Sequence, residues 1–157
     1  MDYSLLLKQS EALIDPALPV ASLSNLSALL FNEIPNLNWV GFYFSKHGRL
    51  ELAMFQGKPA CSILPFGKGV CAHAYQKDKV TVVDDVHAFP GHIACDSASR
   101  SEIVLPLHVE GKPIGVLDID SDIPSRFGKE ETEFLIRVRD LLEEKLPLRE
   151  LSPFLYD

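Results

Sequence analysis

The sequence predicts a single α+β domain in which helices pack on a central antiparallel sheet. Two pairs of alternating apolar segments are joined by short turn sequences, which is typical of β-hairpins, and helix-period segments precede and follow them. Hairpins place neighbouring strands antiparallel, whereas a parallel sheet needs helical crossovers. A chain of 157 residues fits one domain that buries a hydrophobic core without disulfide staples.

The composition excludes several classes of partner. The chain has 46% hydrophobic residues and a formal net charge of -7, and its 15 lysines and arginines form no basic stripe. Such a chain repels polyanions, so we expect no nucleic-acid partner. The N-terminal residues show no export signal, and no apolar stretch approaches the roughly 20 residues that span a bilayer. We expect a cytoplasmic protein with no membrane partner.

The first forty residues predict two helices. Leucines recur at helical spacing over about residues 22–33, and Pro19 and Ser22 stand where they would start and cap this helix. An earlier helix is expected over residues 3–14.

A β-hairpin should follow these helices. Residues 38–44 are aromatic and β-branched, residues 46–48 supply turn chemistry, and residues 49–55 alternate between apolar and polar side chains. Because side chains alternate across a strand, one face of the first strand should carry Trp39, Gly41 and Tyr43.

The second half of the chain predicts a short helix, a brief strand, another hairpin and a long amphipathic helix. Glycines break the chain before the short helix, and a Glu-Gly-Lys-Pro turn separates the two hairpin strands. The expected bounds are about 70–77 for the short helix, 79–83 for the brief strand, 103–109 and 114–120 for the hairpin, and residue 128 onward for the last helix.

Cys95 is the first candidate for chemistry because it lies in a polar loop between two strand-like segments. Asp96, Arg100 and two histidines nearby could lower its pKa and make it a thiolate, although a free cysteine is often just a small buried hydrophobe. Cys61 and Cys71 precede the brief strand. Cys71 stands where a helix N-terminus would stabilise a thiolate.

Metal binding is the competing interpretation of the cysteines. Cys71 and His73, together with His92 and Cys95, could supply four soft ligands. Neither pair has the spacing of the usual zinc motifs, and the insert between the pairs fixes no geometry. We therefore expect no metal site.

Two aspartates near the end of the second hairpin should project side by side. A period of two places Asp118 and Asp120 on the same strand face as Ile114 and Val116. Like charges repel, so a strand holds two carboxylates together mainly at a solvent edge or at a site that binds a cation. The alternative is that the strand has ended and both are solvated turn residues.

Glu102 and Trp39 are further candidates with simple structural alternatives. A partly buried Glu102 could keep a proton near neutral pH and donate it, whereas an exposed one would pair with Arg100. Trp39 is the one tryptophan of the chain and lies beside Gly41. It could form an aromatic wall for a cationic or methyl-bearing ligand, or simply belong to the core.

Five segments along about residues 22–145 resemble a known family when they are taken together. They are residues 38–43, 57–61, 67–71, 85–104 and 115–121, and the run from Pro90 to Cys95 is the most specific. These segments are similar to those of the free methionine-(R)-sulfoxide reductases, which are enzymes built on a GAF domain. The resemblance implies a GAF-like central antiparallel sheet flanked by helices.

The resemblance also implies roles for the candidate residues. Cys95 would be the nucleophile, Cys61 the favoured resolving thiol and Cys71 an auxiliary thiol, while Glu102 would donate a proton. The substrate-pocket positions would be those of Trp39, Glu102, Asp118 and Asp120.

The implied reaction is thiol-dependent reduction of free methionine-(R)-sulfoxide, through a cysteine sulfenic acid and an intramolecular disulfide. No cofactor is expected, thioredoxin is the natural reductant, and a homodimer through the terminal helices is compatible with the sequence. The alternatives are a non-catalytic GAF sensor of a small metabolite and a redox-sensing thiol protein.

Overall fold

In the part of the chain that the structure describes, residues 1–93 and 95–157, six strands form one sheet with antiparallel neighbours. The computed structural model orders them β3-β2-β1-β6-β5-β4. The α+β class and the antiparallel sheet predicted from the sequence are therefore confirmed. The strands are β1 (Leu37–Lys46), β2 (Arg49–Gly57), β3 (Ile63–Leu64), β4 (Thr81–Val83), β5 (Ser101–Val109) and β6 (Lys112–Ser121).

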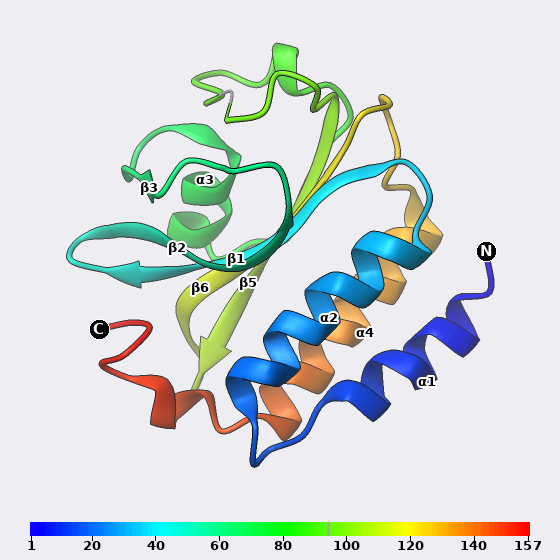
Figure 1. Cartoon of the computed structure of the whole chain (residues 1–157). Helices are drawn as coiled ribbons and strands as arrows, with labels where there is room; N and C mark the ends of the chain where they lie inside the picture. Colours follow the sequence, from blue (N-terminus) through cyan, green and yellow to red (C-terminus); the bar gives the residue numbers. More distant parts are fainter. Residues whose placement is uncertain (94) are drawn as a thin grey trace.

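The helices divide between the two faces of this sheet (Figure 1). On one face lie α2 (Pro19–Glu33) and α4 (Lys129–Lys145), with α1 (Tyr3–Leu13) packed across them. The other face carries α3 (Gly69–Lys77) and the loops around the short 3-10 turn η1 (Val86–Ala88). A second 3-10 turn, η2 (Leu148–Leu151), follows α4. Within the described residues, we find no helix with the length and apolar character needed to cross a membrane.

Strand β1 separates the two hydrophobic clusters by strict alternation. Val40, Phe42 and Phe44 belong to the larger cluster beneath α1, α2 and α4. Trp39 and Tyr43 belong to the smaller cluster on the α3 face. The face assignment made from the sequence is therefore confirmed.

Two local expectations about this framework are wrong. Ile114 packs in the larger cluster and not on the face of Val116. The reason is a bulge in β6, where Ile114 is an extra residue between Pro113 and Gly115, which pair with successive residues of β5. Helix α2 begins at Pro19, whose restricted φ suits a first helical turn, so Ser22 lies inside the helix and does not cap it.

The C-terminal residues return to the turn between β1 and β2 (Figure 1). The ring of Tyr156 is buried and stacks 6.5 Å from that of Phe44, and the Asp157 N–H donates to the Ser45 carbonyl at 3.0 Å. The tail thereby fastens the hairpin that carries Trp39 and Tyr43. The sequence held no periodic signal for this contact.

Replacing Leu6 with alanine should destabilise the domain by about 2–5 kcal/mol, because the side chain is only 1% exposed and packs α1 onto the core. The neighbouring Leu5 is 53% exposed, so its replacement should cost about 0.5 kcal/mol or less. Urea unfolding of both variants measures the difference. Equal small losses would show that α1 is not part of the cooperative core.

Candidate active site

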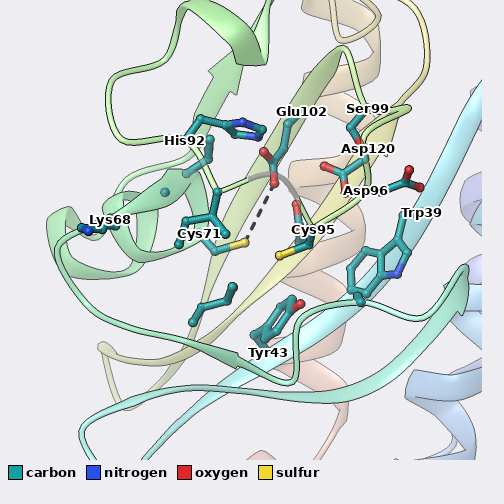
Figure 2. A pocket seen from close by; sticks show the side chains of 16 residues that line it. Trp39, Tyr43, Lys68, Cys71, His92, Cys95, Asp96, Ser99, Glu102 and Asp120 are labelled. Atoms are coloured by element: carbon teal, nitrogen blue, oxygen red, sulfur yellow. Dashed lines mark hydrogen bonds between the residues drawn. The ribbon is translucent and has the colours of Figure 1, made fainter.

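The register of three central strands brings the candidate residues together. Asp120 of β6 pairs with Trp39 of β1 on one side and with Glu102 of β5 on the other. Asp118, two residues earlier, pairs with Gly41. The side chains of Trp39, Glu102 and Asp120 line one cavity on the α3 face of the sheet (Figure 2), and Asp118 lines the same cavity.

The cavity has a volume of about 50 Å³ and collects walls from β1, β5, β6, the start of α3 and the loop before β5. Every site residue predicted from the sequence lines it except Cys61, which is bonded to a lining residue. The predicted residues in its wall are Trp39, Cys71, Cys95, Glu102, Asp118 and Asp120.

Cys61 and Cys95 form a disulfide that joins the loop after β2 to the loop before β5. Their Cα atoms lie 5.5 Å apart although 34 positions separate them in the sequence. The Tyr43 hydroxyl donates to the Cys61 carbonyl oxygen at 2.8 Å and so ties this loop to β1. The pairing is the one that the family resemblance implied.

Cys71 is the free cysteine among the described residues, and it is buried in the first turn of α3. Its Sγ lies 3.9 Å from Oε2 of Glu102, to which it donates (Figure 2). Burial, and then the charges of Asp118 and Glu102, raise the pKa of this thiol well above its usual value. The expectation that the helix N-terminus would make Cys71 a thiolate is therefore wrong, because burial and neighbouring acids outweigh it.

Glu102 is buried, as the proton-donor interpretation required, and Arg100 is exposed, so the expected surface pair between them is not formed. Burial, followed by the charges of Asp118 and Asp120, raises the pKa of Glu102 well above its usual value. A carboxyl in this setting keeps its proton to a higher pH than an exposed one, as a proton donor requires.

Asp118 and Asp120 are strand residues and not the solvated turn residues of the alternative, because β6 continues to Ser121. Asp118 is only 5% exposed, and burial raises its pKa. Burial and the charge of Asp118 raise the pKa of Asp120 well above its usual value. Burial lowers the pKa of His92, which also lines the cavity, so this ring adds no positive charge at neutral pH.

Trp39 serves both as core and as cavity wall. It is 2% exposed and stacks between Tyr43 and Phe55, with ring centroids 5.8 and 5.4 Å away. A Cβ on Gly41 would lie 2.6 Å from the indole ring, so glycine is needed beside it.

Among the described residues, the buried polar atoms without a hydrogen-bond partner include the Trp39 indole nitrogen and Asp118 Oδ1. Both belong to residues that line the cavity.

Comparison with known proteins places this arrangement in a family. The GAF domain model matches residues 19–145. The Escherichia coli (strain K12) protein named free methionine-R-sulfoxide reductase is 47% identical over 135 residues, which cover 86% of this chain and 82% of the relative. The chain belongs to the free methionine-R-sulfoxide reductase family of GAF-domain proteins.

Two further proteins are similar to this member of the reductase family along most of its length. Protein YtsP of Bacillus subtilis (strain 168) is 53% identical over 148 residues, covering 92% of this chain and 91% of the relative. The structure of fRMsr of Staphylococcus aureus in complex with substrate superposes with a TM-score of 0.86 at 47% identity, covering 92% of this chain and 95% of that chain.

Sequence reasoning missed Asn38, which holds the Cys95 loop of this family member against β1. The Asn38 amide donates to Asp96 Oδ2 and to Ser99 Oγ, both at 3.0 Å. Its position directly before Trp39 was the one available signal, and hydrophobic periodicity cannot reveal a polar contact between distant segments.

The zinc ligand set considered from the sequence is not assembled in the structure. His73 is exposed and meets the ring of Phe89 edge-on, and Cys95 is bonded to Cys61. A different group, Cys71, Glu102 and Asp118, offers ligand atoms that all lie within 4.8 Å of one another.

Replacing Glu102 with glutamine should stabilise the protein above neutral pH. The pKa of Glu102 is higher in the folded state than in the unfolded state. The stability that comes from its bound proton is therefore fully present below the unfolded-state pKa, and it is lost as pH rises through the folded-state pKa. Each unit of raised pKa corresponds to about 1.4 kcal/mol. Urea unfolding from pH 4 to 9 should therefore show a flatter pH dependence for Glu102→Gln than for the natural chain.

The matched control is Glu133→Gln, which removes the same kind of ionisable group from an exposed position on α4. This variant should keep the pH dependence of the natural chain. If both glutamine variants had the same profile, the proton would not be held by Glu102.

Proposed function

We propose that this protein is an oxidoreductase that reduces free methionine-R-sulfoxide to methionine with its cysteine thiols. The observation that carries the proposal is the Cys61–Cys95 disulfide, whose Cys95 lines a cavity together with an indole ring and acidic side chains. The relatives support it, because one at 47% identity is named for this activity. Thiol, acid and aromatic wall are the groups that this reaction needs.

The proposed reaction balances without a cofactor. The Cys95 thiolate attacks the sulfoxide sulfur, Glu102 supplies a proton to the oxygen, and the oxygen leaves with Cys95 as a sulfenic acid while methionine is released. The Cys61 thiol then attacks the sulfur of this sulfenic acid, so that water departs and the disulfide forms. An external dithiol, for which we propose thioredoxin, reduces the disulfide and restores both thiols.

The acidic side of the cavity suits the ammonium group of a free amino acid. Asp118 Oδ1 is buried and has no hydrogen-bond partner among the described residues, so an ammonium would supply the donor that it lacks. A positive group would also relieve the repulsion between Asp118 and Asp120. The indole face of Trp39 would then contact the S-methyl end of the substrate.

The start of α3 suits the carboxylate of the same substrate. Gly69 and Val70 line the cavity in the first turn of this nine-residue helix, and no side chain caps its N-terminus. Free N–H groups at a helix N-terminus attract an anion. The two charged groups of a free amino acid would therefore each meet a complementary part of the wall.

The substrate should enter only when the disulfide is reduced. A volume of about 50 Å³ holds only a few water molecules, at roughly 10–15 Å³ of this measure for each. A whole amino acid needs more room, and cleavage of the disulfide frees the Cys61 loop to move away.

Replacing Cys95 with serine should abolish turnover with the fold intact, because a hydroxyl is a far poorer nucleophile than an activated thiol. Cys61→Ser should still release about one methionine per enzyme in a single turnover and then stall with thioredoxin, since its resolving thiol is gone. Rapid-quench assays and steady-state assays measure the two quantities. Near-normal steady-state activity of Cys95→Ser would refute the mechanism, and an inert natural protein would favour a sensor.

Free methionine-R-sulfoxide should be preferred over its N-acetyl derivative by tenfold to a hundredfold or more in kcat/KM. A charge-assisted hydrogen bond contributes about 1.5–3 kcal/mol, and the acetylated substrate has no ammonium to make one. Asp118→Asn and Asp120→Asn should raise KM for the free substrate and reduce this preference, while Glu102→Gln lowers kcat more. Equal kcat/KM for the two substrates in the natural protein would remove the ammonium role.

A further inference from the structure

The group formed by Cys71, Glu102 and Asp118 has the composition of a metal site. One ligand atom from each residue lies within 4.8 Å of the others, and all three side chains are buried. They come from three separate elements, α3, β5 and β6, so the sheet register and the docking of α3 place them together. Figure 2 shows the Cys71 sulfur directed at the Glu102 carboxyl.

Asp118 provides a second observation that points to a ligand. Its side chain is 5% exposed, it lines the cavity, and among the described residues its Oδ1 accepts no hydrogen bond from a backbone N–H or from a side chain other than those of the neighbouring acidic groups. A buried carboxylate oxygen without a donor is costly unless a donor or a cation completes it. Lys68 is the one lysine or arginine among the described residues that line the cavity, and it is exposed.

The separation of the Cys71 and Glu102 donor atoms is close to that around a small four-coordinate ion. Zinc bonds of about 2.3 Å to sulfur and about 2.1 Å to oxygen, at a tetrahedral angle, separate the two donors by about 3.6 Å. The corresponding separation between Cys71 Sγ and Glu102 Oε2 is 3.9 Å. One thiol with two carboxyls favours a thiophilic divalent ion over magnesium or calcium, which take oxygen ligands.

We propose that Cys71, Glu102 and Asp118 bind one divalent cation of the Zn²⁺ or Cd²⁺ class, with cavity water as the fourth ligand. This departs from the expectation of no metal made from the sequence. The cavity of about 50 Å³ has room for an ion and a water while the Cys61–Cys95 disulfide is in place. The site is therefore already available in the disulfide form of the protein.

The cation would act as an inhibitor and not as a cofactor. The ion would occupy the place of the substrate ammonium and would take up the carboxyl that donates the proton. This consequence rests on the proposed function, whereas the binding site itself does not. Cation and substrate would then exclude one another from the cavity.

The test uses the protein in its disulfide form, freed of metal with a chelator and kept without reductant. Calorimetric titration with Zn²⁺ alone should give one equivalent, and Co²⁺ alone should give a thiolate-to-cobalt charge-transfer absorption in the near ultraviolet. Cys71→Ser should abolish this absorption and weaken Zn²⁺ binding at least tenfold. Asp118→Asn and Glu102→Gln should each weaken it at least tenfold, with unchanged circular dichroism.

His73→Ala is the matched control, because this residue is a metal-capable side chain on the same helix that is exposed and outside the cavity. It should leave the binding unchanged. The proposal is overturned if the natural protein binds no Zn²⁺, if Cys71→Ser keeps full affinity, or if His73→Ala loses it. The titrations involve no turnover, so an active protein without zinc binding refutes only the metal site, and a zinc-binding protein without activity refutes only the proposed function.

Discussion

The pairing of β6 with β1 and β5 is the constraint on which the rest of the site depends. It sets Asp120 between Trp39 and Glu102 in one row across the sheet. A slip of one residue would turn every β6 side chain to the opposite face. Leu117 and Ile119 prevent this slip, because both are fully buried against the helices and would be replaced there by carboxylates. The apolar core beneath α2 and α4 therefore decides where the acids of the cavity lie.

The same register makes the empty cavity electrostatically unfavourable. Glu102, Asp118 and Asp120 share it. Burial raises the pKa of all three carboxyls, and the charge of Asp118 raises those of Glu102 and Asp120 further. Burial of apolar side chains elsewhere must offset the cost of burying these acids. The larger hydrophobic cluster, beneath α1, α2 and α4, contributes most of this stabilisation. Any ligand that brings a positive charge recovers part of the cost. The proposed preference for a cationic group thus follows from strand register before any detail of catalysis is considered.

Local patterns predicted the features that follow from alternation within one element. The shared face of Trp39 and Tyr43 and that of Asp118 and Asp120 follow from a period of two, which each strand keeps along these residues. The prediction that Ile114 shares a face with Val116 was wrong because of a bulge where β6 pairs with β5. Such a bulge depends on both strands, so the alternation within one strand does not reveal it. The two-residue strand β3 was missed because so short a strand shows no periodicity. The raised pKa of Cys71 was missed because it depends on acids that come from β5 and β6.

The placement of the thiols supports a division of work between them. Thiol–disulfide chemistry needs an attacking thiolate that can reach its target. Cys71 is held in a helix, and burial and acidic neighbours raise the pKa of its thiol. Cys61 is half-buried in a loop between β2 and β3, where backbone movement is least costly, and it already meets Cys95. In the proposed reaction a resolving thiol approaches and withdraws in every cycle, so the loop cysteine suits that role and the helical cysteine suits a fixed wall of the cavity.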